Sequence, residues 1–427
     1  MRDYLKRLFL NTGNPSRDSY MWNMIQSMLI SVQSVILLMV INRTNTLSDA
    51  GVFSIAYAVA SLMYYLGEYG VRKFQVTDVN EQASFSDYYT HRVITCTITA
   101  LASIIYAAVG MIRGQYYTEK ALIILIVCLV KDLEAYCDVY FARFQQKGRL
   151  DAAAKASTYR IVLPLLFCMA SLILTHNMII SMCVWLAATV FALMTSFVLI
   201  APEFGTAEFV LNKPKLLMIT RECLPLFLGN FLLLYVGNAP KYAIDACMSN
   251  EDQACYNFIF MPVFVIGLLA NFVFNPILME LAREWNDGNY KRFYALVKRQ
   301  TAVISGITLL AIIVALTIGC PVLGILFHAD LSGYRMHLTV LMLGGGLLAF
   351  VNFLAVIVTV LRGQKKLIIG YLVSALTAGL FSTTVVKMYG LWGACVLYTS
   401  LMVIVTVIFA VIFAVCARSA RKTAETA

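Results

Sequence analysis

One long uncharged run limits what this chain can fold into. Residues 161–202 contain no lysine, arginine, aspartate or glutamate. As a single α-helix the run would be about 63 Å long at about 1.5 Å per residue, roughly twice the thickness of the hydrocarbon core of a bilayer. It therefore predicts two membrane-spanning helices with a turn near His176 and Asn177. Composition agrees, because 60% of the chain is hydrophobic and only 13% is charged, which excludes a soluble globular domain.

Similar apolar runs recur along the whole chain. A helix needs about 20 apolar residues to cross the hydrocarbon core, and most of the runs approach that length. We predict an all-α polytopic membrane protein with about twelve transmembrane helices. The predicted spans are residues 20–41, 50–69, 93–112, 121–142, 160–175, 178–200, 223–246, 255–279, 301–320, 337–361, 367–386 and 391–416.

The basic residues predict the orientation of these helices. With a cytoplasmic N-terminus, most of the 33 lysines and arginines, Arg92 and Arg160 among them, fall in segments on the cytoplasmic side, as the positive-inside rule requires. The C-terminus is then cytoplasmic too. The net charge of +10 is explained by topology, and we expect no nucleic-acid partner.

Two short patterns suggest an internal duplication. Arg-x-Gln-x-Lys follows the fourth span at residues 143–147 and the tenth span at residues 362–366. The turn at residues 47–53 also aligns with residues 250–256. We therefore predict two parallel six-helix lobes. The predicted segments are a cytoplasmic start at residues 1–19, an N-lobe at 20–200, a cytoplasmic linker at 201–222, a C-lobe at 223–416 and a cytoplasmic tail at 417–427.

Charged side chains within the fourth span are the main functional signal. The span carries Lys131, Asp132, Glu134 and Asp138, and the spacing puts Lys131, Glu134 and Asp138 on one helical face. Charges at bilayer depth are costly, so these groups should face the protein interior or a water-filled cavity. We predict Lys131 as a substrate contact and the three carboxylates as ion-coupling candidates. The alternative is a self-neutralising stripe that only holds helices together.

Further polar residues lie in or beside other spans. Lys241 and Asp245 in the seventh span are four residues apart and could pair, with Asp245 a fourth ion-coupling candidate. Lys241 is our second substrate contact, although snorkelling to the interface would explain it equally well. Residues 344–346 are three glycines, which suit either a hinge or close helix packing. The remaining predicted substrate-binding residues are Arg43, Arg72, Asn238, Asn271 and Asn275.

Catalytic and metal-binding patterns are missing from the sequence. The four histidines are dispersed, and no Walker loop, HExxH motif or nucleophile elbow occurs. The eleven cysteines have no metal-ligand spacing, and only Cys247 and Cys255 flank a short loop where a disulfide could form. We predict no enzyme activity, no catalytic residue, no metal and no cofactor.

Residues 49–58 and 67–74, with residues 138–149 after the fourth span, resemble a known family. They are similar to polysaccharide-repeat flippases of the multidrug, oligosaccharidyl-lipid and polysaccharide exporter superfamily. The resemblance implies translocation of an undecaprenyl-pyrophosphate-linked oligosaccharide across the bacterial inner membrane by alternating access, for O-antigen or capsule synthesis. It also implies membrane lipids and polysaccharide polymerase machinery as partners.

The pyrophosphate-sugar head of such a substrate cannot cross the hydrocarbon core unaided, because it would lose its water. In this hypothesis a hydrated passage between the lobes shields the head, and Lys131 and Lys241, with Arg43 and Arg72, supply positive potential. Two alternatives stay open. One is an ion-coupled exporter of small, often cationic compounds on the same fold, and the other is an intramembrane enzyme or assembly partner.

Overall fold

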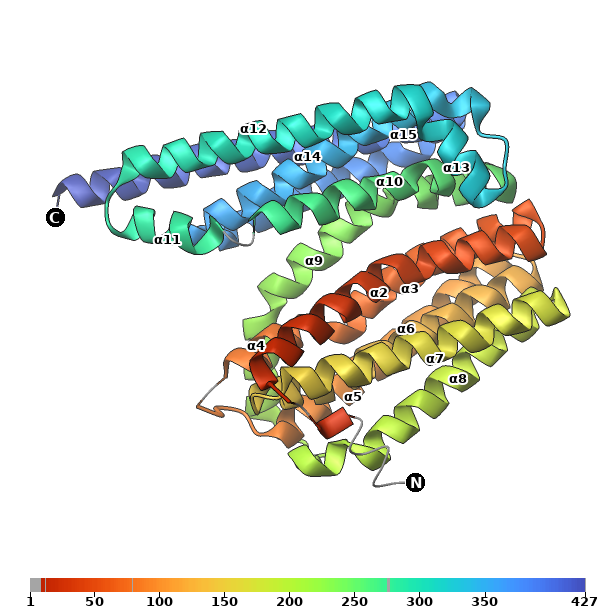
Figure 1. Ribbon diagram of the computed structural model, residues 1–427, viewed down its shortest axis with the longest axis horizontal. Helices are drawn as coiled ribbons and strands as arrows, with labels where there is room; N and C mark the ends of the chain where they lie inside the picture. The colour runs from red at the N-terminus through yellow and green to blue at the C-terminus, as the bar shows by residue number, and fades with distance from the viewer. Residues whose placement is uncertain (1–8, 12, 79, 275–276, 427) are drawn as a thin grey trace. The chain divides into compact units, whose positions relative to one another are not determined.

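The computed structural model describes residues 9–11, 13–78, 80–274 and 277–426. All regular elements of these residues are helices, so the predicted all-α class is confirmed (Figure 1). Contacts divide the chain into two compact units, Met1–Phe231 and Leu232–Ala427. The point of division lies inside a long helix, α9 (Lys213–Cys247), shortly after the linker predicted at residues 201–222.

The first unit contains six long helices and one short one. Helices α3 and α6 pack against each other, α5 also packs on α6, and α7 packs against α2 and α8. The six long helices match the first six predicted spans, but several begin earlier than the apolar runs do. The helices are α2 (Pro15–Thr44), α3 (Leu47–Glu68), the short α4 (Val71–Thr77), α5 (Phe85–Ile112), α6 (Thr118–Gln146), α7 (Leu150–Thr175) and α8 (Met178–Leu199).

The second unit is built around α14, which packs against α10, α12 and α15 (Figure 1). Helix α15 is two helices, because Gly390 has non-helical dihedral angles (φ 57°, ψ −142°). The chain doubles back there, and the rings of Tyr371 and Phe409 lie 5.0 Å apart. The helices that follow α9 are α10 (Asn250–Phe274), α11 (Leu278–Asn286), α12 (Tyr290–Val314), α13 (Cys320–Phe327), α14 (Arg335–Val360) and α15 (Gln364–Thr426).

Nine helices in the described part of the chain are long and apolar enough to cross a membrane, counting α15 once. Helices α6 and α10, with 29 and 25 residues, also have the necessary length. Helix α6 lacks an uninterrupted apolar stretch because four charged residues lie in its middle. With the two parts of α15 counted separately, the described residues contain the twelve long helices that the sequence predicts.

Side-chain hydrogen bonds cap several of the helix starts, and two of these caps follow the predicted repeat. Thr46 and Asp49 cap α3 reciprocally, each side chain accepting the other residue's backbone N–H. Ser249 and Asp252 cap α10 in the same way. Each such cap satisfies backbone N–H groups that the first helical turn leaves unpaired. Because Asp49 and Asp252 are matched in the sequence alignment of the two turns, the shared cap supports the duplication.

The turn predicted within the uncharged run is confirmed. Helix α7 ends at Thr175, and His176 adopts the left-handed conformation (φ 48°) that reverses the chain. The Asn177 side chain then accepts the backbone N–H of Ile180 at 3.0 Å and starts α8. The Asn45 amide donates to the His176 carbonyl oxygen at 3.0 Å, so this turn is tied to the end of α2.

The three consecutive glycines of α14 are packing positions. A methyl group added at Gly344 would lie 2.6 Å from the ring of Tyr398, and one at Gly345 would lie 3.1 Å from Ile266. One at Gly346 would collide with Thr308. Each glycine thus lets a different helix (α15, α10 or α12) approach α14 closely, which favours the packing interpretation over a hinge.

Candidate functional site

The charged residues predicted on one face of α6 point into the first unit and are paired there. Lys131 Nζ lies 2.8 Å from Glu134 Oε2, and Arg160 of α7 lies 3.2 Å from Glu134 Oε1. All three side chains are buried. Lys131 is about 20 Å along α6 from its first residue, so the group lies deep within the helical bundle. One carboxylate is therefore shared by two basic side chains.

A second carboxylate, Asp138, has the same arrangement one turn further along α6. It forms an ion pair with Arg72 of α4 through Oδ1, and Arg92 of α5 lies 3.9 Å from Oδ2. Arg92 is completely buried and donates to the Gly67 carbonyl oxygen at 2.6 Å. The predicted site residues Arg72 and Asp138 are thus brought together from helices far apart in sequence.

Two further carboxylates line the same interior. Glu68, at the end of α3, is buried and accepts the backbone N–H of Gly70 at 2.9 Å. Asp132 has one buried oxygen, Oδ1, with no hydrogen-bond partner among the described residues. The basic side chains Lys131, Arg72, Arg92 and Arg160 and the acidic side chains Glu68, Asp132, Glu134 and Asp138 form what we call the α6 charge cluster, which is neutral if all eight groups are ionised.

Sequence reasoning missed three members of this cluster, which are Glu68, Arg92 and Arg160. It assigned Arg92 and Arg160 to the cytoplasmic segments as topological charges. The structure buries both, because α5 begins at Phe85 and α7 at Leu150, well before the apolar runs start. The sequence does contain a sign of this for Arg160, because the predicted span at residues 160–175 is shorter than the roughly 20 residues that cross a membrane. That shortfall implied a helix extending backwards through Arg160.

Lys241 lies in the second unit and differs from Lys131 in its partners. Its Nζ is 4.7 Å from the centroid of the Phe260 ring, and the side chain is 5% exposed. No ion pair joins Lys241 to Asp245 in the described structure, although their i, i+4 spacing allows one. Lys241 is buried and does not snorkel to an interface. Asn238, one helical turn earlier on α9, is buried as well.

The structure says less about the other predicted site residues. Arg43 is exposed at the end of α2. Asn271 lies in α10, but its side chain is outside the described part of the structure, and Asn275 lies outside the described residues altogether. Cys247 and Cys255 are both free thiols, as are the other nine cysteines.

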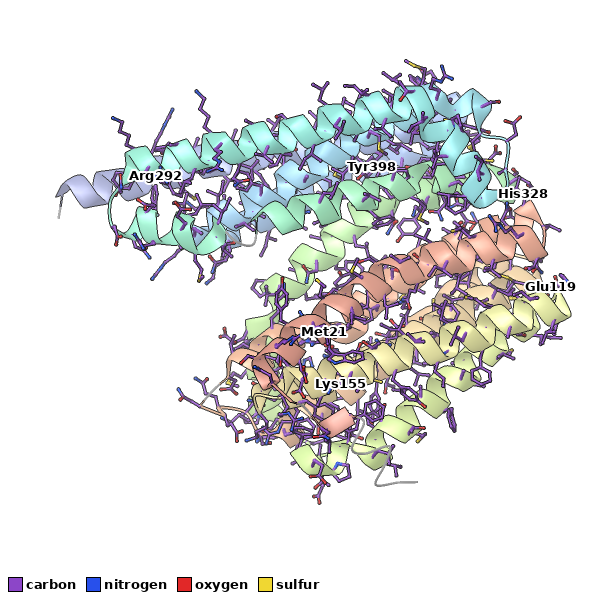
Figure 2. All side chains as sticks on the ribbon, viewed as in Figure 1. Met21, Glu119, Lys155, Arg292, His328 and Tyr398 are labelled. Carbon is purple, nitrogen blue, oxygen red and sulfur yellow. The ribbon has the colours of Figure 1, made fainter. Side chains whose placement is uncertain are left out.

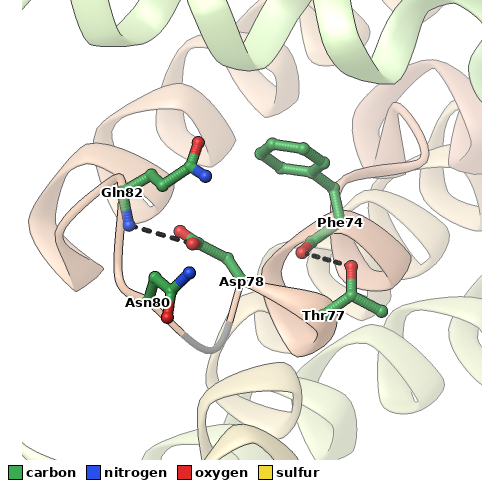
Figure 3. Close-up of a pocket in the computed structure, with 5 residues that line it drawn as sticks. All are labelled: Phe74, Thr77, Asp78, Asn80 and Gln82. Carbon is green, nitrogen blue, oxygen red and sulfur yellow. Dashed lines mark hydrogen bonds between the residues drawn. The ribbon is translucent and has the colours of Figure 1, made fainter.

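A small recess lies at the loop between α4 and α5 and is lined by Phe74, Thr77, Asp78, Asn80 and Gln82 (Figure 3). Its volume is about 140 Å³. Asp78 accepts the backbone N–H groups of Gln82 and Ala83 at 2.9 and 3.1 Å. Burial raises the pKa of Asp78, but these hydrogen bonds outweigh it and hold the pKa below its ordinary value. The carboxylate therefore shapes the loop, and the recess is too small for a drug-sized ligand.

The fold is that of known transporters. No known protein family pattern matches the sequence, and no curated protein sequence is similar to it. Solved structures do match. An inward-facing multidrug resistance MATE family transporter of the MOP superfamily is 13% identical, with a TM-score of 0.70 over 95% of this chain and 99% of that one.

Two further structures agree with this match. A MOP superfamily transporter from Pyrococcus furiosus, described as having a binding pocket of reverse polarity that suggests a different function, is 13% identical. It has a TM-score of 0.60 over 97% of this chain and 98% of that one. An outward-facing multidrug resistance MATE transporter is 15% identical, with a TM-score of 0.57 over 99% of each chain. This chain is a multi-pass membrane protein with the fold of MOP superfamily transporters. All three of these structures are described as transporters.

Proposed function

We propose that this protein is a secondary transporter of a bacterial inner membrane that exports small amphiphilic compounds and is driven by an ion gradient. The fold supports transport, since multidrug transporters share it over nearly the whole chain. The observation that carries ion coupling is the α6 charge cluster, in which Glu134 faces two buried basic side chains and Asp138 faces the buried Arg92 and the partly exposed Arg72. Ionisable groups at this depth are costly and mark ion or proton pathways in membrane proteins.

The cluster can couple proton binding to a change of conformation. A proton on Asp138 removes the negative charge between Arg72 and Arg92, so that the fully buried Arg92 and the partly exposed Arg72 lose their shared partner. Breaking a buried ion pair in this way costs about 3–5 kcal/mol. A conformation in which Arg72 reaches water relieves that cost, and Arg72 is the member of the pair that is already partly exposed. Protonation then shifts the population between two conformations, as alternating access requires.

Transport by the purified protein tests this proposal. Reconstituted liposomes with an imposed proton or sodium gradient should accumulate a fluorescent amphiphilic compound, and dissipating the gradient should abolish accumulation. Asp138→Asn should lower gradient-driven accumulation at least tenfold while the protein still inserts. Asp287→Asn, which alters an exposed carboxylate of the second unit, is the matched control and should behave as wild type. Accumulation that does not depend on either gradient would refute ion coupling.

The second candidate is the lipid-linked oligosaccharide flippase that the sequence resemblance implies, acting with polysaccharide polymerase machinery. The buried lysine of the second unit favours it, because Lys241 has no carboxylate partner among the described residues and could meet an anionic head group. Deletion of the gene separates the two candidates. Loss of an exporter should increase susceptibility to amphiphilic compounds and leave surface polysaccharide normal, whereas loss of a flippase should do the reverse.

A further inference from the structure

One face of α10 carries buried polar atoms without a hydrogen-bond partner in the described part of the chain. Gln253, Tyr256 and Asn257 are 1%, 0% and 4% exposed. Both polar atoms of the Gln253 amide, the Tyr256 hydroxyl and Asn257 Oδ1 have no hydrogen-bond partner among the described residues. The spacing of these residues, with Phe260 seven positions after Gln253, places them on a single face of the helix.

Side chains from two other helices reach the same face. The Lys241 ammonium of α9 lies over the Phe260 ring at 4.7 Å from its centroid. The ring of Tyr398 in α15 meets Phe260 edge-on at 4.9 Å, and Tyr256 stacks on Phe260 at 5.7 Å. The Tyr398 hydroxyl is also buried without a hydrogen-bond partner among the described residues. Figure 2 shows Tyr398 within the bundle of the second unit.

These groups are expensive to keep inside a protein for packing alone. Each buried polar group without a partner costs about 1–3 kcal/mol, and a charged one costs more. Native structures bury few such groups, and several of them on one helix face, beside a lysine that lies over the Phe260 ring of the same face, call for an explanation. A bound group with oxygen acceptors would pair with the donors among them, which are the Lys241 ammonium, the Gln253 Nε2–H and the hydroxyls of Tyr256 and Tyr398.

We propose that Lys241, Gln253, Tyr256 and Tyr398 form a binding site for a carboxylate group carried by an aromatic or otherwise apolar molecule. One formal positive charge matches a singly charged carboxylate. Ammonium, amide and hydroxyl donors are the hydrogen-bond partners that carboxylate oxygens use. The stacked rings of Tyr256 and Phe260 supply an apolar wall for the rest of the molecule. The claim that this ligand is the transported compound rests on the proposed function. The claim that it binds at this site does not.

The first unit provides an internal contrast. Phe260 corresponds to Tyr57 when the two repeated turns are aligned, and Lys131 lies over the Tyr57 ring at 4.8 Å, much as Lys241 lies over Phe260. Lys131, however, is neutralised by Glu134. Both units therefore place a lysine ammonium over an aromatic ring. Only Lys131 has a carboxylate partner among the described residues, and for Lys241 a ligand would supply that carboxylate.

Direct binding tests the site without relying on transport. The full-length protein in nanodiscs is dialysed against radiolabelled 2-naphthoate, and binding to empty nanodiscs is subtracted. Saturable binding is expected, and the neutral analogue 2-naphthamide should bind at least tenfold more weakly. Lys241→Met should weaken naphthoate binding at least tenfold and Lys241→Arg should retain most of it. Lys291→Met, an exposed lysine of the same unit, should leave it unchanged.

The outcomes that overturn the proposal are distinct. Undetectable naphthoate binding by the wild-type protein, equal binding of the amide, or unchanged binding by Lys241→Met would each do so. Displacement of naphthoate by methyl phosphate but not by acetate would show that the site binds a phosphate head group and not a carboxylate. Thermal unfolding of Lys241→Met guards against loss of fold, since removing an unpaired buried charge should not lower the unfolding temperature. Binding without transport in liposomes would defeat the proposed function and leave the site standing.

Discussion

Replacing Glu134 by glutamine tests whether the α6 charge cluster is held together as the structure indicates. Glu134 lies 2.8 Å from Lys131 Nζ and 3.2 Å from Arg160 Nη1, and all three side chains are buried. Glutamine keeps the shape and removes the charge, so two buried cations lose their shared counter-ion. Breaking a buried pair costs about 3–5 kcal/mol. An exposed pair, such as Arg283 with Asp287, contributes about 0–1 kcal/mol, so Asp287→Asn provides the matched control.

The assay is reversible unfolding in detergent, with the double variant Glu134→Gln, Lys131→Met included. Because Lys131→Met removes one of the orphaned cations, the double variant should recover part of the stability that Glu134→Gln loses. A coupling energy of about 0.5–3 kcal/mol is expected for side chains in contact. If Glu134→Gln and Asp287→Asn lower the free energy of unfolding equally, or if the two substitutions at positions 131 and 134 are additive, the cluster is not a coupled network.

Two further predictions concern other parts of the chain. Gly344→Ala places a methyl group 2.6 Å from the Tyr398 ring, so it should destabilise the protein by about 1–3 kcal/mol in thermal unfolding, whereas no change would mean that α14 and α15 pack less closely. Hydrogen bonds from Lys147 and Arg143 hold the pKa of Glu81 below its ordinary value, so this carboxylate stabilises the fold above about pH 4.3 and loses that contribution as the pH falls through its lowered pKa. Glu81→Gln should therefore be less stable than wild type at pH 7, with the difference vanishing in acid; a difference that persists at pH 2 would contradict this assignment.

Local pattern was enough to predict much of this protein. Apolar length gave the number of long helices, and the uncharged run at residues 161–202 located the turn at His176. The spacing of Lys131, Glu134 and Asp138 placed them on one face of α6, because helical periodicity is a property of the chain itself. The orientation of the chain in the membrane and the limits of its domains stay predictions.

The partners of those charges were decided by tertiary structure. The sequence places Arg92 and Arg160 among the cytoplasmic charges. Only the packing of α5 and α7 against α6 brings them to Asp138 and Glu134. Lys241 has a carboxylate at i+4, yet its ammonium lies over an aromatic ring of α10. Which face of one helix meets which face of another depends on how each is rotated and how closely it packs, and a linear sequence of spans does not specify either. The chemistry of the interior therefore followed from the assembled helices, while their number and length followed from the sequence.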